Sequence, residues 1–261
     1  MATASHTSDQ ASDSSGLKQR LDLTSKRLDL TSKIASIPVV PDGFHDEQDR
    51  LRASAEVGWR HQIFSKSVGG VTRVDQCRFA TWQYAREPID AKRQKVVVEA
   101  VAEWATSAAE RLKSRESLVL FGPCGTGKDH LQIAACNQAV IQSGVSAIWV
   151  NCRQLMSRAR DAIASSDTER SMMAELEAVD VLVLSDPLPV TGELSWYQAD
   201  MLYRIVENRG EAGKVTNVTL NVADDEEADR RLGVATWDRI CHRAWKIECA
   251  WPSHRQPSRV V

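Results

Sequence analysis

The residues GPCGTGKDHL at 122–131 constrain the fold more than any other stretch of this chain. They follow SLVLFG, a short apolar run typical of a buried strand, and they open a stretch with helical periodicity. Glycines allow backbone conformations and close approaches that a Cβ would block, and a helix N-terminus attracts phosphate. Gly122, Gly127 and Lys128 therefore predict a phosphate-binding loop between a strand and a helix, with a glycine-rich turn without ligand as the alternative.

The residues of this loop have separate expected roles in holding ATP. Successive backbone N–H groups point at the β-phosphate, and Lys128 supplies a positive charge to the β- and γ-phosphates. We expect nucleotide contacts from the whole stretch, which comprises Gly122, Pro123, Cys124, Gly125, Thr126, Gly127, Lys128, Asp129 and His130.

Asp129 stands where loops of this kind usually carry Ser or Thr, whose hydroxyl helps to hold Mg²⁺. A carboxylate also binds Mg²⁺, because this ion prefers oxygen ligands. The carboxylate nevertheless brings negative charge close to the β-phosphate. The loop therefore predicts ATP and Mg²⁺ as cofactors and leaves the metal geometry open.

A second acidic position follows the apolar run that ends in Ser185-Asp186. An acid at the end of such a strand handles magnesium or the attacking water in P-loop enzymes, which makes Asp129 and Asp186 the candidate magnesium ligands. Many of these enzymes have two adjacent acids here, whereas this chain has Ser185 in the first position. One hypothesis is that Asp129 and Ser185 have exchanged carboxylate and hydroxyl; the other is independent change in a weak or inactive ATPase.

Apolar runs alternate with amphipathic patterns along the rest of the chain, which predicts an α/β fold with a parallel sheet covered on both faces. We expect further strands at 146–151, 179–186, 216–221 and 245–251. We expect helices at 87–112, 128–142, 152–165 and 195–210, and two short helices at 225–233 and 234–244.

Residues 1–70 are expected to form a disordered, partner-binding N-terminal region with a short helix within 47–70. Residues 1–35 contain eleven Ser or Thr, too little apolar surface to offset the entropy of ordering. The repeat RLDLTSK at 20–26 and 27–33 is either a partner-binding heptad or a simple duplication.

Composition excludes several classes of protein. The net charge of −2 excludes a polybasic nucleic-acid binder, so such binding would need a local patch. The six cysteines form no C-x-x-C pair, which argues against a zinc site and indicates reduced thiols in a cytoplasmic protein. No stretch reaches the roughly 18 apolar residues of a membrane span, so no membrane partner is expected.

Five motifs occur in order along the chain: LVLFGPCGTGKDHLQIAA, VDVLVLSDP, YRIVENRGEAGKVTNVTLN, RLGVATWDRI and WPSHR. Over roughly residues 71–256 this set resembles the DnaC/IstB-type AAA+ ATPases, which are bacterial and phage replicative-helicase loaders and transposition helper proteins. The resemblance implies an AAA+ P-loop NTPase domain at 71–261. Its fold would have three α/β/α layers around a parallel central sheet and no substantial lid.

The same resemblance implies roles for three further residues. Asn221 matches sensor 1, which contacts the γ-phosphate or the attacking water, and Arg255 matches the Arg of the sensor 2 role. Arg239 matches an arginine finger that reaches the nucleotide of a neighbouring subunit, which implies a homo-oligomer. From the residues alone, Arg239 fits a surface salt bridge and Asn221 a strand-end cap equally well. The expected catalytic residues are Lys128, Asp186, Asn221 and Arg239.

The family tolerates a non-hydroxyl residue after the loop lysine, so Ser185 is the larger departure. The resemblance also implies contact with single-stranded DNA near Arg153, Arg158 and Arg160, which otherwise form an ordinary solvated helix face. We therefore expect a magnesium-dependent ATPase that loads a replicative helicase gripped by the N-terminal region. The alternatives are an IstB-like transposition helper ATPase and an ATP-binding adaptor that does not hydrolyse.

Overall fold

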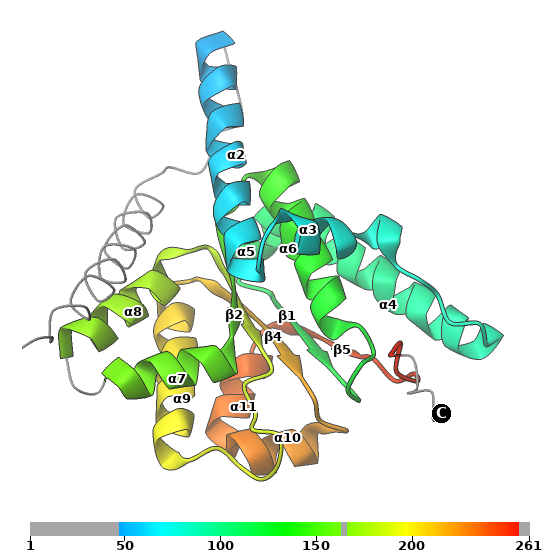
Figure 1. Ribbon diagram of the computed structural model, residues 1–261, viewed down its shortest axis with the longest axis vertical. Helices are drawn as coiled ribbons and strands as arrows, with labels where there is room; N and C mark the ends of the chain where they lie inside the picture. Colours follow the sequence, from blue (N-terminus) through cyan, green and yellow to red (C-terminus); the bar gives the residue numbers. More distant parts are fainter. Residues whose placement is uncertain (1–46, 163–165, 256–261) are drawn as a thin grey trace, which may run out of the picture.

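A computed structural model describes residues 47–162 and 166–255 (Figure 1). The disorder expected for residues 1–35 and the RLDLTSK repeat lie outside the described residues. Within the described ranges, no helix is long and apolar enough to cross a membrane.

Five short strands form one sheet in which every pairing is parallel, in the order β2-β3-β4-β1-β5. The predicted α/β class with a parallel sheet is therefore confirmed. Among the described residues, β5 is the last element of the chain. The strands are β1 (Ser117–Phe121), β2 (Ala147–Asn151), β3 (Val181–Ser185), β4 (Val215–Leu220) and β5 (Ala244–Glu248).

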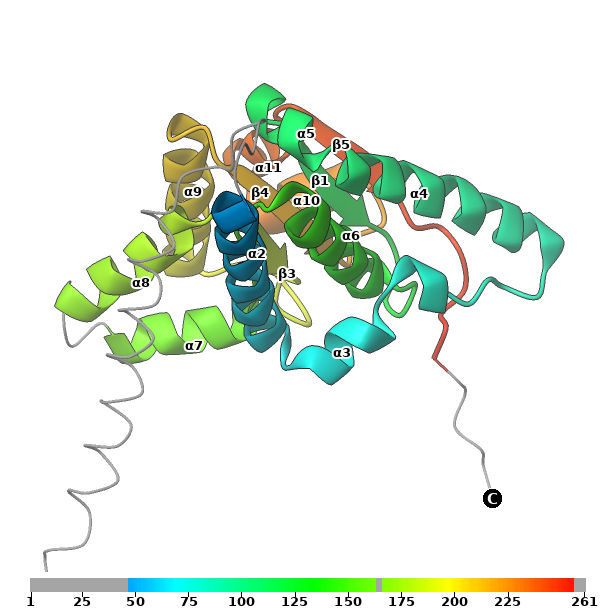
Figure 2. The same ribbon diagram turned by 90° about the horizontal axis from the view of Figure 1, so that it is seen from above.

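Helices cover both faces of this sheet because its strands are apolar on both sides (Figure 2). Along β1, Leu118 and Leu120 belong to one buried cluster, and Val119 and Phe121 belong to the other. The first face carries α2 (Glu47–Val68), α3 (Val71–Gln76), a 3₁₀ turn (Phe79–Thr81), α4 (Pro88–Thr106), α5 (Ala108–Ser114) and α6 (Lys128–Ser143). The second face carries α7 (Cys152–Ala162), α8 (Ser166–Ala178), α9 (Trp196–Glu211), α10 (Asp225–Leu232) and α11 (Val234–Cys241).

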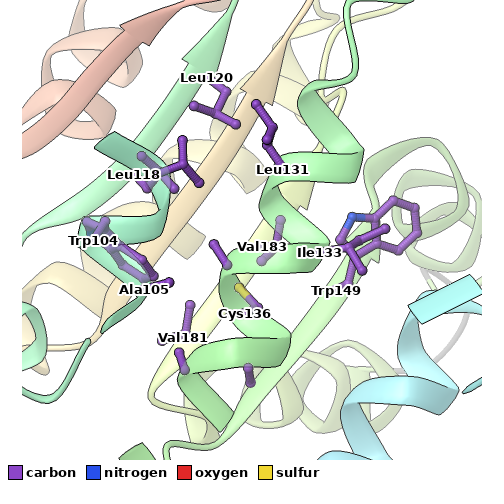
Figure 3. Packing of buried hydrophobic residues seen from close by; sticks show 14 of the residues in the cluster. Trp104, Ala105, Leu118, Leu120, Leu131, Ile133, Cys136, Trp149, Val181 and Val183 are labelled. Carbon is purple, nitrogen blue, oxygen red and sulfur yellow. The ribbon is translucent and has the colours of Figure 1, made fainter. Parts of the chain in front are cut away.

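Helix α6, which begins at the loop lysine, is anchored in the middle of the first layer. Its apolar side chains Leu131, Ile133 and Cys136 are fully buried and face the sheet (Figure 3). At about 25 cal/mol per Å² of apolar surface, each large side chain buried here contributes roughly 1.5–3 kcal/mol. The loop is therefore held between two rigid elements.

Two helices differ from the sequence expectation. The single helix expected at 87–112 is broken at Ser107, where the backbone leaves helical geometry with φ −97° and ψ 21°. The Thr106 and Ser107 hydroxyls donate to the carbonyl oxygens of Ala102 and Glu103, both at 2.8 Å, and such bonds compete with the helix ladder. Of the helix expected at 152–165, residues 152–162 are described and form α7, and a further helix that was not expected, α8, begins at Ser166.

Helix α2 is 22 residues long, and so is not the short helix expected within 47–70. Its first turns stand clear of the body, but Phe64 and Val68 are buried in the first layer (Figure 1). The Ser67 hydroxyl accepts a 2.9 Å hydrogen bond from the Trp149 backbone N–H on the edge strand β2. The C-terminal part of α2 therefore packs against the rest of the described structure.

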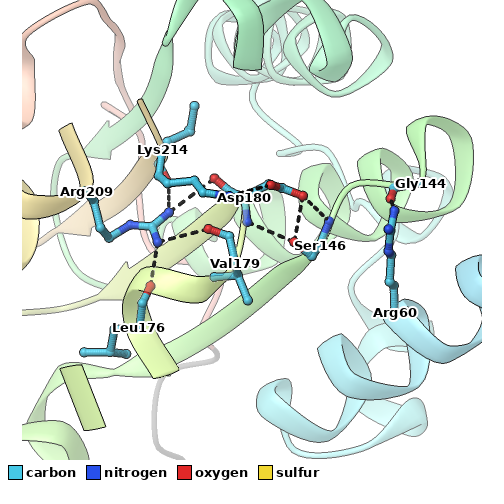
Figure 4. A network of polar contacts seen from close by, with 9 residues as sticks. Arg60, Gly144, Ser146, Leu176, Val179, Asp180, Arg209 and Lys214 are labelled. Carbon is cyan, nitrogen blue, oxygen red and sulfur yellow. Dashed lines mark hydrogen bonds and ion pairs between the residues drawn. The ribbon is translucent and has the colours of Figure 1, made fainter. Parts of the chain in front are cut away.

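A buried polar network ties the amino ends of β3 and β4 to the second layer (Figure 4). The fully buried Arg209 donates to the carbonyl oxygens of Val179 and Val215 at 3.1 and 2.6 Å. Asp180 accepts from the Ser146 hydroxyl at 2.7 Å and from Lys214 Nζ at 2.9 Å. Burial raises the pKa of Asp180, but these hydrogen bonds outweigh burial, so the net shift of its pKa is downward.

Candidate functional site

The loop after β1 meets the carboxyl ends of β3 and β4 around a cavity of about 280 Å³, here called the loop cavity. Carboxyl ends of parallel strands lie at one edge of a sheet, where ligands of open α/β folds bind. The loop cavity is lined by Cys124, Gly125, Gly127, Lys128, Asp129, His130, Asp186, Thr219, Asn221 and Arg255. The expected residues Gly122, Pro123 and Thr126 complete the loop around Lys128.

Two glycines of the loop accommodate neighbours that would collide with a side chain. A Cβ on Gly127 would lie 2.6 Å from the Trp82 ring, and a Cβ on Gly125 would lie 2.0 Å from Ser253 Oγ. Both glycines also have positive φ, +82° at Gly125 and +90° at Gly127. Trp82 and Ser253 therefore pack closely against the loop, and its conformation requires glycine at positions 125 and 127.

Lys128 is buried at the base of the loop. Its Nζ donates to the carbonyl oxygens of Gly122 at 2.8 Å and Pro123 at 2.6 Å. Burial lowers the pKa of this ammonium group. A phosphate group entering the loop cavity would replace carbonyl partners with a full negative charge, which is a stronger acceptor.

Asp129 lies beside Ser185, the residue that stands in place of an expected acid. Asp129 Oδ1 accepts hydrogen bonds from Ser185 Oγ and from Thr219 Oγ1, both at 2.9 Å. The hydroxyl and the carboxylate of the exchange hypothesis are therefore in direct contact. Thr219 was not among the residues expected from the sequence, although the two-residue alternation of β4 places it on the same side of the strand as Asn221.

Asp186 and Asn221, both expected at the site, are brought together. Asn221 Nδ2 donates to Asp186 Oδ1 at 2.8 Å, and Arg153 Nη2 donates to Asp186 Oδ2 at 3.0 Å. Asp186 has φ +50°, a left-handed conformation that costs a non-glycine residue about 1–3 kcal/mol. Such strain is characteristic of functional sites, and Arg153, expected only at a DNA surface, contacts this acid.

The segment at 251–255 and Trp82 cover the loop from outside. The Trp251 indole N–H donates to the Thr126 carbonyl oxygen, and the His254 backbone N–H donates to the Gly125 carbonyl oxygen, both at 2.9 Å. The His254 ring lies 5.0 Å from the Trp82 ring in an edge-to-face arrangement. Burial, and then the neighbouring His130, lowers the pKa of His254. These contacts hold Arg255 at the rim of the loop cavity.

Arg239 is far from the loop cavity of its own chain. It is exposed on α11 and forms a two-pronged ion pair with Glu207, with Nε–Oε2 at 2.7 Å and Nη2–Oε1 at 2.9 Å. It lines a different cavity together with Ser117 and Val215, the first residues of β1 and β4. A five-residue strand spans roughly 17 Å, so Arg239 lies at the opposite edge of the sheet from the loop.

The three arginines expected at a DNA surface lie on the exposed face of α7. The opposite face of this helix is buried through Leu155, Met156 and Ala159. Arg158 pairs with Glu175 at 3.6 Å, and Arg153 pairs with Asp186. This face of α7 is basic. One of its cations, Arg153, is connected to the loop cavity through its ion pair with Asp186, which lines that cavity.

The model of the family described as IstB-like ATP binding protein matches residues 80–260, well over half of the chain. The chain belongs to this ATP-binding family. The replicative helicase loader DnaC of Escherichia coli (strain K12) is 32% identical over 148 residues, covering 56% of this chain and 58% of the relative. The insertion sequence IS1162 putative ATP-binding protein of Pseudomonas fluorescens is 28% identical over 201 residues, covering 77% of this chain and 81% of the relative.

Solved structures show the same fold at low identity. The DnaC helicase loader superposes with a TM-score of 0.58 at 18% identity, covering 68% of this chain and 99% of that chain. DnaI gives 0.54 at 21% identity, covering 72% and 95%. AMPPCP-bound DnaA from Aquifex aeolicus gives 0.53 at 15% identity, covering 67% and 50%. The fold is that of the AAA+ P-loop proteins, as expected.

The oxygen donors of the loop cavity fit a magnesium ion. Asp129 and Asp186 offer hard carboxylate oxygens, with the Ser185 and Thr219 hydroxyls beside them. Mg²⁺ is commonly held by one or two carboxylates together with substrate phosphates and water. In the described ranges no group of three or more His, Cys, Asp or Glu residues forms a metal cluster, and all six cysteines are free thiols.

Proposed function

We propose that this protein is a magnesium-dependent ATPase that loads a replicative helicase onto single-stranded DNA. The observation that carries the ATPase is the convergence of Lys128, Asp129, Asp186 and Asn221 around one cavity behind a glycine loop. The loader role rests on the identity with a relative named a replicative helicase loader, 58% of which is covered by this chain.

Several residues of the loop cavity have roles that follow from their positions. Lys128 and the loop N–H groups bind the β- and γ-phosphates, and Asn221 orients the attacking water or the γ-phosphate. Asp129 and Asp186 would hold Mg²⁺, which supplies charge neutralisation for the phosphates when bound. Arg255 contacts phosphate from the rim. Phosphoryl transfer needs positioning and charge stabilisation more than a covalent catalyst.

The exchange of hydroxyl and carboxylate between positions 129 and 185 is part of this proposal. The 2.9 Å contact between Ser185 Oγ and Asp129 Oδ1 supports it, because either side chain can reach the same volume. In this arrangement Asp129 provides the charge and Ser185 the hydroxyl.

DNA on α7 would act on hydrolysis through Arg153. In the free protein, Arg153 and Asn221 together occupy both oxygens of Asp186. Arg153 lies on the exposed face of α7, so DNA phosphates would compete with the Asp186 carboxylate for the guanidinium group of Arg153. Their binding would leave Asp186 available for its catalytic role.

The test is ATP hydrolysis by the full chain with and without Mg²⁺ and single-stranded DNA, with Lys128→Ala as the blank. Turnover that requires Mg²⁺, rises with single-stranded DNA and is absent in the blank would support the proposal. The loader role further requires that the full chain co-elutes with the replicative helicase of the same organism. Failure to do so would remove the loader role and leave the ATPase.

Two other functions each have an observation in their favour. A transposition helper is favoured by the match to the insertion sequence IS1162 putative ATP-binding protein, which extends over 77% of this chain and 81% of that relative. Stimulation by duplex DNA in preference to single strands would support it. An ATP-binding adaptor is favoured by Ser185 in place of an acid. Magnesium-dependent ATP binding without turnover, with or without DNA, would support the adaptor.

A further inference from the structure

A further cavity, of about 440 Å³, lies between α2, the edge strand β2 and α7 (Figure 2). We call it the edge cavity; Trp59, Lys66, Trp149 and Arg158 are among its lining residues. Its volume is within the roughly 300–1,000 Å³ typical of sites that receive small organic groups. Half of its lining residues lie at 59–73, before residue 80, where the match to the family model begins. Membership of the family therefore does not account for this cavity.

One face of α2 forms a wall of the edge cavity. Trp59, Gln62, Ile63 and Lys66 recur at the three- and four-residue spacing that places side chains on one side of a helix. Another side of α2 is anchored to the first layer through the fully buried Phe64. The lining side chains of α2 are therefore held in place by a packed helix.

Trp59 offers the available aromatic face of the edge cavity. Its side chain is only partly buried, and in the described ranges its ring contacts neither another aromatic ring nor a cation. Trp149, the other tryptophan of the lining, is 7% exposed, and the Arg73 guanidinium group lies 4.7 Å from the centre of its ring. A planar group that enters the edge cavity would therefore stack on Trp59 and not on Trp149.

The lining of the edge cavity carries three cations and one acid. Arg158 and the acid, Glu175, pair with each other at 3.6 Å. Arg73 Nη1 donates to the Val68 carbonyl oxygen at 2.9 Å, a neutral partner. Lys66 is exposed and has no ion pair within the described part of the chain. The edge cavity therefore has an excess of positive charge beside an aromatic face.

This combination matches the chemistry of single-stranded nucleic acid. Cations contact its phosphates, an aromatic ring stacks on a base, and side-chain amides can hydrogen-bond to the edge of that base. Gln62, Asn151 and Gln154 supply such amides in the lining. Arg158 belongs both to the edge cavity and to the basic face of α7. This shared residue favours DNA over an acidic protein segment, because a strand whose phosphates contact α7 reaches the edge cavity at Arg158.

We propose that the edge cavity receives a base of single-stranded DNA, which stacks on Trp59 while Lys66 and Arg158 contact the flanking phosphates. The inference rests on the DNA binding of the proposed function and deepens it. Contacts to α7 alone would involve phosphates, whereas the edge cavity makes binding depend on the presence of a base. It also makes α2, which lies outside the family match, part of the DNA surface.

The test compares two labelled strands of equal length, oligothymidylate and the same backbone without bases, by fluorescence anisotropy with the full chain. The wild type should bind oligothymidylate more tightly than the abasic strand. Trp59→Leu should weaken the binding of oligothymidylate about tenfold, because it removes the ring on which one base stacks. Its affinity for the abasic strand should be unchanged, which also shows that the variant is folded.

Three further variants separate stacking from charge and from structure. Trp59→Phe keeps an aromatic face and should recover most of the affinity lost in Trp59→Leu. Trp196→Leu removes an 81% exposed tryptophan of α9 that does not line the edge cavity, and it should bind both strands like the wild type. Lys66→Gln should weaken the binding of both strands. The slope of log affinity against log salt should become shallower by about 0.7 in this variant, because one phosphate contact is lost.

Three results would overturn the inference while leaving DNA binding intact. One is equal affinity of the wild type for the two strands, a measurement that needs no variant. Another is a Trp59→Leu variant that binds oligothymidylate as tightly as the wild type. The third is a synthetic peptide rich in Glu and Leu that binds the wild type but not Trp59→Leu, while both strands bind the two proteins equally. That result would assign the edge cavity to an acidic protein segment.

Failure of the proposed function would look different. A wild-type protein that binds neither strand would refute its DNA-binding part, and one without magnesium-dependent turnover would refute the ATPase.

Discussion

The ion pair between Arg153 and Asp186 leads to a quantitative prediction about DNA-dependent hydrolysis. The two groups are 3.0 Å apart, and 56% of the Arg153 side chain and 24% of the Asp186 side chain are exposed. Pairs this exposed contribute about 0.2–1 kcal/mol. Since about 1.4 kcal/mol is tenfold in rate, Arg153→Gln should raise the DNA-free rate by roughly 1.4- to 5-fold.

The assay is steady-state phosphate release with and without single-stranded DNA. The Arg153→Gln variant should show the higher DNA-free rate and a stimulation by DNA that is smaller by about the same factor. The difference between variant and wild type should shrink at high salt, because exposed charges are screened there. Arg170→Gln, the same change at an exposed position of α8, should behave like the wild type.

One result would refute this reasoning. If Arg153→Gln keeps full stimulation by DNA and its DNA-free rate stays equal to or below that of the wild type, the ion pair does not restrain Asp186. The proposal would then keep the ATPase but lose its connection to DNA through α7.

Three further changes test the loop cavity and the core. Asp129→Thr and Ser185→Asp should each lower magnesium-dependent turnover at least tenfold, and the combined change should recover part of it. Asp180→Asn should lower the free energy of unfolding by about 1–3 kcal/mol at pH 7, since the substitution removes a half-buried carboxylate from its hydrogen bonds. Because the folded pKa of Asp180 is lowered, that difference should shrink as pH falls below about 4, measured by urea unfolding. Gly125→Ala should weaken ATP binding about tenfold by calorimetry, since a left-handed alanine costs about 1–2 kcal/mol before any steric clash.

Each of these predictions can be contradicted by a specific result. A combined 129/185 variant no better than either single change would end the exchange hypothesis. A stability difference at Asp180 that stays constant from pH 7 to pH 3 would show that its charge is not the cause. Gly192→Ala is the control for Gly125, because Gly192 has φ +77° but open space around it. Equal loss of ATP affinity in both would show that the contact with Ser253 does not matter.

The sequence by itself determined the position of the phosphate-binding loop, the strand before it, the helix after it and the parallel sheet. These features depend on neighbours in the chain: a run of apolar residues, a glycine spacing, a periodic pattern. The same local logic placed Asp186 and Asn221 at the end of a strand, and therefore at one edge of the sheet. The break at Ser107 went unpredicted, because a hydroxyl that bonds back to the helix leaves the apolar pattern unchanged.

Tertiary structure alone decided which distant residues complete the site. Thr219 reaches Asp129 across 90 residues of sequence, and Arg153 reaches Asp186 across 33. Only the folded chain places Trp82 against Gly127, or moves Arg239 to the edge opposite its own loop. Such contacts depend on how strands are ordered within the sheet and on which helix covers which face. The apolar periodicity of the sequence predicts neither the strand order nor the face that each helix covers. The same periodicity is compatible with every order in which buried parallel strands can pair.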